Sequence, residues 1–258
     1  MATLARTSSP HDEYTEHCLE LLGSLGPCQV LRMFGGHGIY LDGLMFGLIA
    51  GERLYLKVDA QTRPQWEAAG GEPFVFTARG RLVATSYYTP PDEAMESPAL
   101  MRPWARLALE AALDAARAAL CAESAGALSM LLEMCIQQLK DRRQFGRPLA
   151  DFQALQHRLA DLYVAVEQVR AMSALAAMAV HESRAGERAR LVSAARVTTD
   201  EAARFVGEWA VQLHGAMGMT EECLVAHYVR RLLVASARYG TTGQHLQRYA
   251  AHREEELA

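Results

Sequence analysis

The stretch DRRQFGRPLADFQALQHR, residues 141–158, decides the fold of the second half of the chain. Gly146 and Pro148 are both unfavourable inside a helix, and Pro148 disfavours helical angles at Arg147, so a turn is predicted here. Apolar residues recur at helical spacing on both sides of this turn, which predicts two long helices that meet at a corner. They are Leu128, Leu131, Leu132, Cys135 and Leu139 before it, and Phe152, Leu155, Leu159, Leu162, Val166 and Val169 after it.

The corner itself is rich in side chains that donate hydrogen bonds. It carries Arg142, Arg143, Gln144 and Arg147. Guanidinium and amide groups at a helix corner suit an anionic ligand. A solvated basic turn is the alternative interpretation, and spacing alone leaves both open.

The longer segment RRQFGRPLADFQALQHRLADLY resembles the start of the C-terminal helical domain of acyl-CoA dehydrogenases. The resemblance extends from about Arg117 to the end of the chain. It implies an all-α up-and-down helical bundle over residues 113–258. It also implies that FAD is the cofactor and that the corner reaches across a subunit interface to the FAD of a neighbouring subunit.

The same resemblance assigns flavin contacts to three segments of the second half. Taken singly, each residue also suits a solvated polar surface or a helix end, and only their order and spacing favour a flavin site. Ala216 stands where the family has a second glycine. The assigned residues are Arg142, Gln144, Phe145, Gln153, Gln212, Gly215, Ala216, Thr242 and Gln244.

The family's catalytic glutamate has no counterpart in this sequence. Its usual position falls at Gly240, and a second position known in the family falls at Ala116. Neither residue can accept a proton, so the family motif assigns no catalytic base in this sequence. Arg117 matches the family's active-site arginine, and His245 and Asp114 are weak candidates to replace the base. Loss of a general base typically costs about 10²–10⁴-fold in rate.

The segments Tyr239-Gly240 and His245-Leu246 resemble the small-subunit, pimeloyl-CoA type of acyl-CoA dehydrogenase. That type implies a homo-oligomer, or a heteromer with a large subunit that supplies the glutamate, with an acyl-CoA as the possible substrate. The family's N-terminal helical domain and middle β-domain have no match in the chain. An acyl-CoA dehydrogenase-like flavoprotein subunit that is not catalytically competent alone is therefore the expected function.

The first half has a different pattern, in which short apolar runs alternate with turn residues. Strands are predicted at 29–33, 38–41, 44–50, 53–58, 74–77 and 81–88, and a short helix at 61–69. Asp42-Gly43 between two apolar runs is a strong hairpin signal. A helical stripe precedes these strands and a long alanine-rich helical segment follows from Ser97. The pattern predicts an α+β domain with an antiparallel sheet over residues 1–112.

The segment MFGGHGIYLDGLMFGLIAGERLYLKVD, with the later TSYYTP, resembles the N-terminal domain of TfoX/Sxy competence regulators. Its glycines are expected to permit tight turns and close backbone contacts. This resemblance implies an alternative function: a non-catalytic regulatory or interaction protein that uses the bundle for oligomerisation.

Composition excludes several other classes. The net charge of −4 gives no electrostatic reason to expect nucleic acid as a partner. The five cysteines form no CxxC pair, so no metal site is expected, and reduced thiols suit a cytoplasmic protein. The N-terminus has no signal-peptide pattern, and the longest apolar run (174–180) is too short for a membrane span.

Two further sets receive structural interpretations. The charged residues at 184–190 and Arg230-Arg231 are expected to lie on solvated helix faces. Met172, Met178, Met217 and Met219 are expected to fill the core rather than to bind a cofactor.

Overall fold

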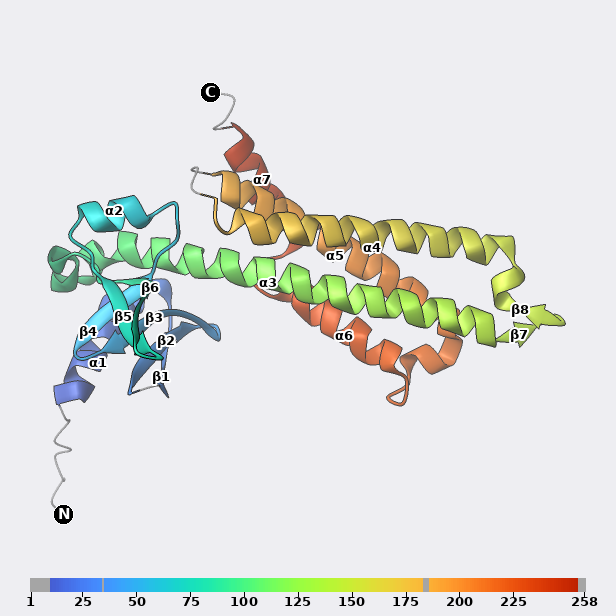
Figure 1. Ribbon diagram of the computed structural model, residues 1–258, viewed down its shortest axis with the longest axis horizontal. Coiled ribbons are helices and arrows are strands. Elements are labelled where there is room, and N and C mark those ends of the chain that lie inside the picture. The colour runs from blue at the N-terminus through green and yellow to red at the C-terminus, as the bar shows by residue number, and fades with distance from the viewer. Residues whose placement is uncertain (1–9, 34, 183–185, 255–258) are drawn as a thin grey trace, which may run out of the picture. The chain divides into compact units, whose positions relative to one another are not determined.

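The computed structural model describes residues 10–33, 35–182 and 186–254. The chain divides into two compact units, Met1–Leu113 and Asp114–Ala258 (Figure 1). The first unit contains an antiparallel sheet with helices and the second is a helical bundle, so the predicted fold class is confirmed. Phe34 of the Met33–Gly36 segment lies outside the described residues.

The first unit is built on a six-stranded antiparallel sheet with the order β1-β2-β3-β4-β6-β5. Its strands are β1 (Gln29–Met33), β2 (Gly36–Leu41), β3 (Leu44–Ala50), β4 (Arg53–Lys57), β5 (Pro73–Ala78) and β6 (Arg81–Tyr88). Its helices are α1 (Pro10–Leu22), η1 (Gly23–Leu25), α2 (Arg63–Ala68) and η2 (Asp92–Glu96), followed by the first turns of α3 (Pro98–Asp141). All the predicted strands are present, and β2 begins two residues earlier than expected.

The core of the first unit joins one face of the sheet to its helices. Trp66 of α2 is fully buried and meets Trp104 of α3 edge to face, with ring centroids 4.9 Å apart. Ala105 and Ala108 of α3 are also fully buried in this cluster. Small side chains at these positions let the helix backbone approach the sheet closely, which explains the alanine-rich sequence that opens α3.

Gly36 shows why this segment is rich in glycine. A Cβ at Gly36 would lie 2.3 Å from the carbonyl oxygen of Ile49 on β3, and one at Gly38 would lie 2.7 Å from the sulfur of Met33. Real Cβ atoms do not approach other atoms this closely. The expected close backbone contacts are therefore present, and they lie inside the sheet.

The second unit is a bundle in which α5 packs against α4, α6 and α7. Its elements are the remainder of α3, β7 (Arg143–Gln144), β8 (Arg147–Pro148), η3 (Leu149–Asp151), α4 (Gln153–Ala179), α5 (Glu187–His214), η4 (Gly215–Met219), α6 (Leu224–Ala237) and α7 (Thr242–Glu254). The apolar positions predicted on either side of the turn form its core: Leu128, Leu131, Cys135 and Leu139 of α3 and Leu162, Val166 and Val169 of α4 are all buried.

Helix α3 is long and apolar enough, by length and composition, to cross a membrane. Half of its most apolar stretch of 18 residues is buried inside the protein. The helix supplies core residues to both units, so its apolar character is already explained by packing.

The methionine prediction is wrong for three of its four residues. Met178, Met217 and Met219 are 73%, 62% and 70% exposed, whereas Met172 packs at the edge of a buried cluster. Helical spacing does not reveal that Met178 lies on an outer face of α4 or that the other two lie in η4, beyond the end of α5.

Candidate functional site

The predicted corner between α3 and α4 is a small β-hairpin at the end of the two helices (Figure 1). β7 pairs with β8 so that Arg143 faces Pro148 and Gln144 faces Arg147. Phe145 and Gly146 form the tip, with φ of 54° and 80°. Positive φ at both tip residues is the geometry of a type I′ turn, which fits the twist of a two-residue hairpin and recurs at Arg79 and Gly80 between β5 and β6. The predicted turn is confirmed, with a hairpin in place of a simple corner.

The hairpin presents its polar side chains to solvent. Arg142, Arg143, Gln144 and Arg147 are all exposed. Phe145 is 88% exposed and meets Phe152 edge to face, with centroids 6.1 Å apart. The guanidinium carbon of Arg147 lies 4.1 Å from the centre of the Phe152 ring.

The hairpin is tied to the helix ends by its backbone. The amide of Leu149 donates to the carbonyl of Arg142 at 2.8 Å, and the amide of Arg142 donates to Gln138 at 2.9 Å. Gln153, another predicted flavin contact, is exposed at the start of α4. Four predicted contacts therefore lie together at this end of the bundle: Arg142, Gln144, Phe145 and Gln153.

A second group of predicted contacts lies where α5 ends. Gln212 is exposed on the last turn, and Gly215, with φ of 66°, directs the chain into η4. A Cβ at Gly218 would lie 3.0 Å from the carbonyl oxygen of Val211, so glycine is needed for η4 to fold back on α5. Gly215 and Ala216 are both exposed.

The third group, Thr242 and Gln244, lies at the start of α7. Gln244 already forms hydrogen bonds within the protein. Its side-chain oxygen accepts a hydrogen bond from the backbone amide of Thr241 at 2.8 Å, and its backbone amide donates to the Thr241 hydroxyl at 3.3 Å. This reciprocal pair is a capping box, which satisfies two amides at a helix N-terminus. The spacing Thr-x-x-Gln at residues 241–244 indicates a capping box, and the assignment of Gln244 as a flavin contact does not take this into account.

Thr242 lines a cavity of about 410 Å³ between α5, α6 and the start of α7. Its other polar lining includes Asp200, Arg204 and Ser236. Thr242 also hydrogen-bonds Asp200. Gln212 is 12 residues further along α5 than Asp200, which corresponds to about 18 Å along the helix. The predicted flavin contacts are thus spread along the described bundle and are not gathered around one cavity.

Asp200 is a buried carboxyl that the sequence interpretation missed. Burial raises its pKa to about 6, although the charge of Arg196 and the hydrogen bond from Thr242 act against this. Arg196 is fully buried, contacts Asp200 at 3.0 Å and donates to the carbonyl of Ala235 at 3.1 Å. Asp200 is only 6% exposed, so the loss of solvation of its charged form outweighs the attraction of Arg196. The pair fixes α5 against the end of α6.

Gly240, at the position of the missing glutamate, packs against the imidazole ring of His245. Gly240 has φ of 118°, and a Cβ there would lie 3.0 Å from Nε2 of His245. Arg117 donates from Nε to the carbonyl of Tyr239 at 3.0 Å, so the matched arginine does lie beside this turn. Ala116 is half-buried on α3 and offers no polar group.

His245 is poorly suited to replace the base. It is 1% exposed, and its Nε2 has no hydrogen-bond partner within the described residues. Burial lowers its pKa to about 4, and the charges of Arg117, Arg196 and Arg248 add to this effect. The imidazole is therefore neutral near pH 7, and the positive surroundings make it a weak proton acceptor.

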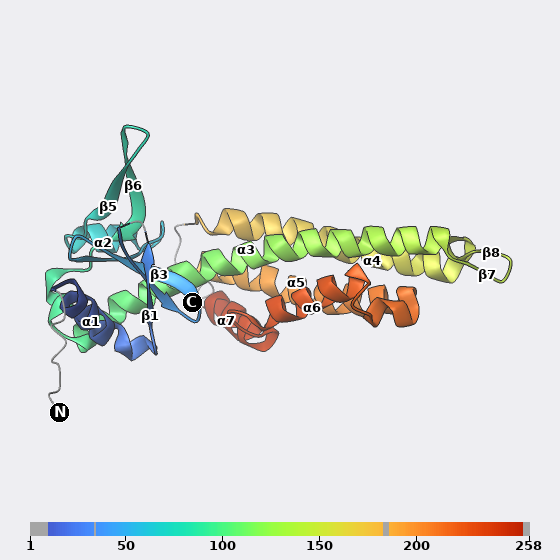
Figure 2. The same cartoon turned by 90° about the horizontal axis from the view of Figure 1, so that it is seen from below.

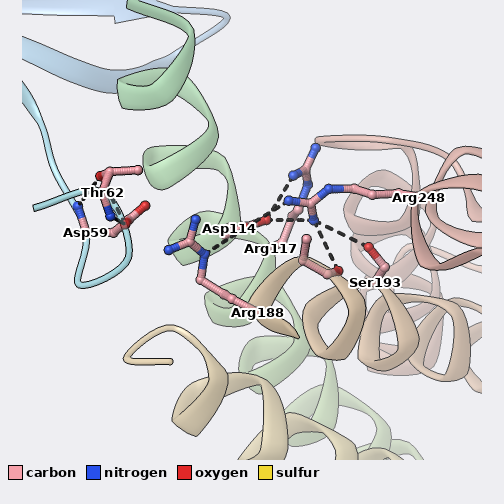
Figure 3. A network of polar contacts seen from close by, with 8 residues as sticks. Asp59, Thr62, Asp114, Arg117, Arg188, Ser193 and Arg248 are labelled. Atoms are coloured by element: carbon pink, nitrogen blue, oxygen red, sulfur yellow. Dashed lines mark hydrogen bonds and ion pairs between the residues drawn. The ribbon is translucent and has the colours of Figure 1, made fainter. Parts of the chain in front are cut away.

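Asp114 is also unsuited, because three guanidinium groups surround it (Figure 3). Arg117 contacts Oδ1 at 3.0 Å, Arg188 contacts Oδ2 at 3.0 Å, and Arg248 contacts Oδ1 at 2.8 Å. Burial alone would raise the pKa of this fully buried carboxyl, but the hydrogen bond and charge of Arg248, with the other two arginines, lower it. Asp114 stays ionised as the centre of an ion cluster.

This cluster corrects the expectation for the charged run at 184–190. Arg188 is 6% exposed and bonds to Asp114, so it does not lie on a solvated face. Residues 184 and 185 of the run lie outside the described residues. Arg230 and Arg231 are exposed and pair with Glu221 and Glu123, as expected for a solvated surface.

Residues 105–253 match the family described as "Acyl-CoA dehydrogenase, C-terminal domain". The chain belongs to the acyl-CoA dehydrogenase family. Residues 20–112 match a second description, "TfoX N-terminal domain". Both resemblances inferred from the sequence motifs are thereby confirmed.

Curated relatives of this family member include acyl-CoA dehydrogenase IpdE2 of Mycolicibacterium smegmatis, 38% identical over 54% of this chain and 42% of the relative. The short-chain specific acyl-CoA dehydrogenase of Megasphaera elsdenii is 33% identical over 50% of this chain and 33% of the relative. The chain thus spans less than half the length of these relatives.

Solved structures show the same fold. The butyryl-CoA dehydrogenase of Megasphaera elsdenii is 21% identical with a TM-score of 0.54, covering 84% of this chain and 51% of that chain. The Tcur3481-Tcur3483 steroid ACAD variant is 24% identical with a TM-score of 0.55, covering 89% of this chain and 63% of that chain. At these identities the likeness establishes the fold alone.

Proposed function

We propose that the chain is a flavoprotein-type subunit of an acyl-CoA dehydrogenase, which contributes the β7–β8 hairpin to an FAD site completed by another subunit. The observation that carries this proposal is the conformation and exposure of Phe145. The two-residue turn requires positive φ here, as it does at Arg79, and for a bulky residue this conformation costs about 1–3 kcal/mol. Here the strained residue is also an aromatic ring that is 88% exposed.

The neighbouring side chains have the chemistry that a flavin dinucleotide requires. Arg142 offers a fixed fork of donors for a phosphate oxygen, and Gln144 offers an amide that both donates and accepts. The Phe145 ring supplies an apolar surface against which a planar group can stack. Gln212 and the exposed backbone at Gly215 supply further polar contacts at the end of α5. All of these groups face solvent, which suits edge contacts to a ligand enclosed mainly by a partner.

In this proposal the chain does not carry out the reaction alone. FAD, when bound, supplies the hydride acceptor in this family. The α-proton of the acyl-CoA then requires a carboxylate, and the two family positions for it are Gly240 and Ala116. Asp114 is held by three arginines and His245 is buried with a lowered pKa. The base and much of the acyl-CoA pocket are therefore assigned to a partner subunit, either a second copy or a larger dehydrogenase chain.

The test is a titration of the purified chain with FAD, followed by the flavin absorbance and by quenching of flavin fluorescence. We expect saturable binding that weakens at least tenfold in Arg142→Ala, which corresponds to about 1.4 kcal/mol. Arg170→Ala is the matched control, since Arg170 is exposed on α4 and pairs with Glu167 of the same helix. Equal affinity of both variants would refute the role of the hairpin.

A second arm tests the need for a partner. The chain is mixed with a full-length acyl-CoA dehydrogenase from the same source, and FAD binding and acyl-CoA oxidation are measured with and without Arg142→Ala. We expect oxidation only in the mixture. Oxidation by the isolated chain would refute the assignment of the base to a partner, and absence of flavin binding in every mixture of folded proteins would refute the proposal as a whole.

The lack of room for a side chain at Gly240, where a Cβ would lie 3.0 Å from Nε2 of His245, favours one alternative. This alternative is a non-catalytic regulatory or interaction protein built on the TfoX-like unit. In that case the bundle serves assembly, and the purified chain is colourless but oligomeric. Flavin titration separates the two functions, because an assembly scaffold needs no saturable flavin site.

A further inference from the structure

Strand β5 forms one edge of the six-stranded sheet, and its hydrogen-bonded neighbour is β6. Figure 2 shows the β5–β6 hairpin extending beyond the other strands of its sheet and beyond α2. The outer side of β5 has no strand partner within the described residues. An unpaired edge of this kind is a template for a further strand unless charges, proline or a bulge protect it.

The turn of this hairpin determines which backbone groups point outward. Arg79 and Gly80 form a two-residue loop with φ of 48° and 75°, so Ala78 and Arg81 form the hydrogen-bonded pair that closes it. Because hydrogen-bonded and non-hydrogen-bonded pairs alternate, Phe76 bonds to β6 and the amide and carbonyl groups of Val75 and Thr77 point to the free edge.

The side chains of the hairpin are apolar and accessible. Val75 and Phe76 are each 44% exposed, and Leu82 and Val83 on β6 are 78% and 39% exposed. Residues from Pro73 to Ala78 include no charged side chain, and Pro73 protects only the start of the strand. The opposite edge strand, β1, carries Arg32 next to its last residue, and a charged side chain on an edge strand is a common protection against edge pairing.

The charges that flank β5 select the direction in which a second strand can pair. Glu72 precedes the strand and Arg79 follows it, and both side chains are exposed; one carboxylate oxygen of Glu72 accepts a hydrogen bond from Arg53 at 2.9 Å, which leaves the other open to solvent-side contacts. Two copies of β5 that pair antiparallel bring Glu72 of each copy near Arg79 of the other. Parallel pairing in register would instead place like charges side by side, which is unfavourable.

We propose that the free edge of β5 pairs antiparallel with β5 of a second copy of this chain. The register that uses all the outward groups places Val75 opposite Thr77 of the second copy, as hydrogen-bonded pairs. Phe76 then lies opposite Phe76 of the second copy, across the two-fold axis. The contact joins two sheets into one continuous sheet and covers apolar side chains near the tip of each hairpin.

Cysteine cross-linking tests this register directly. In a non-hydrogen-bonded antiparallel pair the Cα atoms are about 4.5 Å apart, which is within the range of a disulfide. Phe76→Cys is therefore expected to give a covalent dimer under mild oxidation. Leu82→Cys is the control: in this register its two copies are separated by three strand spacings, or about 14 Å. It is more exposed than Phe76 but is expected to give at least tenfold less dimer.

A second variant removes one outward hydrogen-bond donor. Proline is tolerated on an edge strand when its missing amide would face solvent, so Thr77→Pro preserves the pairing of β5 with β6. In the Phe76→Cys background, Thr77→Pro is expected to reduce covalent dimer at least tenfold, while Thr77→Ser leaves it unchanged. Circular dichroism verifies that each variant is folded.

The readout is specific to this edge, because a disulfide at residue 76 requires the two β5 strands to lie directly beside each other. Equal cross-linking of Phe76→Cys and Leu82→Cys, or no dimer from a folded Phe76→Cys variant, would overturn the proposal. If Thr77→Pro is unfolded, the comparison between the two cysteine variants decides the outcome alone.

Discussion

Replacement of Asp114 by asparagine isolates the electrostatic role of the buried ion cluster. Asp114 is fully buried, and its two carboxylate oxygens receive Arg117, Arg188 and Arg248 at distances between 2.8 and 3.0 Å. The amide has nearly the same volume but no charge, so the three guanidinium groups lose the buried carboxylate that they share. Removing one member of a buried ion pair typically costs about 3–5 kcal/mol. We expect a loss of this size in the free energy of unfolding of the bundle.

The assay is urea unfolding followed by far-ultraviolet circular dichroism, since most helical residues belong to the bundle. Asp161→Asn is the matched control: this carboxylate is 58% exposed and pairs with Arg158 on one helix, so its loss should cost at most about 1 kcal/mol. In a Trp209→Phe background, which removes the tryptophan of α5, the first unit provides an internal reference through Trp66 and Trp104, whose environment should change little.

The dependence on pH provides a second check of the same reasoning. The pKa of Asp114 is lowered in the folded protein, so its stabilising effect is complete above the unfolded value of 3.8 and is lost as pH falls through the lower, folded value. The difference between wild type and Asp114→Asn should therefore narrow below about pH 4. A difference of less than about 1 kcal/mol at neutral pH, equal to that of the control, would refute the view that the cluster holds the bundle together.

Three further predictions concern the same region and the sheet. The pKa of His245 is lowered to about 4 in the folded protein, below its ordinary value of 6.5. The stability that depends on a neutral His245 is therefore fully present above pH 6.5, and up to about 3 kcal/mol of it is lost as pH falls toward 4. His245→Leu should abolish that part of the pH dependence of the free energy of unfolding. Gly240→Ala should lower the free energy of unfolding by about 1–3 kcal/mol because φ is 118°. Gly243→Ala should instead be neutral or slightly stabilising, because its φ is not in the left-handed region and its Cβ would lie 4.0 Å from the Thr241 hydroxyl oxygen, an ordinary contact. Gly36→Ala should destabilise the first unit by about 1–3 kcal/mol, measured by tryptophan fluorescence during denaturation, because its Cβ would meet a backbone carbonyl at 2.3 Å.

The strands of the first unit could be predicted because their signals are local. Alternation of apolar residues and the Asp-Gly turn at Asp42 lie within a few residues of the strands they determine. Strands β3 and β6 have the predicted bounds. The hairpin at Phe145 was less visible, since its four paired residues are too few to form a periodic pattern.

The ion cluster could not be predicted because its members are distant in sequence. Arg188 and Arg248 are 74 and 134 residues from Asp114, and each stands near other charged residues, among which the sequence does not mark one member as buried. Burial of a charge depends on a partner that only the packed bundle supplies. The exposed methionines have the same cause, because the face of a helix that stays open depends on which neighbours cover the others.

A motif that a chain shares with an enzyme family can serve ligand binding or the fold alone. In the described structure, some segments of the motif have a structural use and others do not. At the start of α7, Gln244 caps the helix with Thr241, and Arg117 bonds to the carbonyl of Tyr239. These family residues have a structural use without any ligand, so resemblance there is evidence for the fold. At the β7–β8 hairpin, Arg142 and Phe145 are exposed, and Phe145 adopts a conformation that costs free energy. The pairing of β7 with β8 offsets part of that cost within the hairpin, but the Phe145 ring stays 88% exposed. A ligand or partner that covers this ring would add to the offset, and for this reason the hairpin, rather than the region of the absent glutamate, is the first place to test for flavin binding.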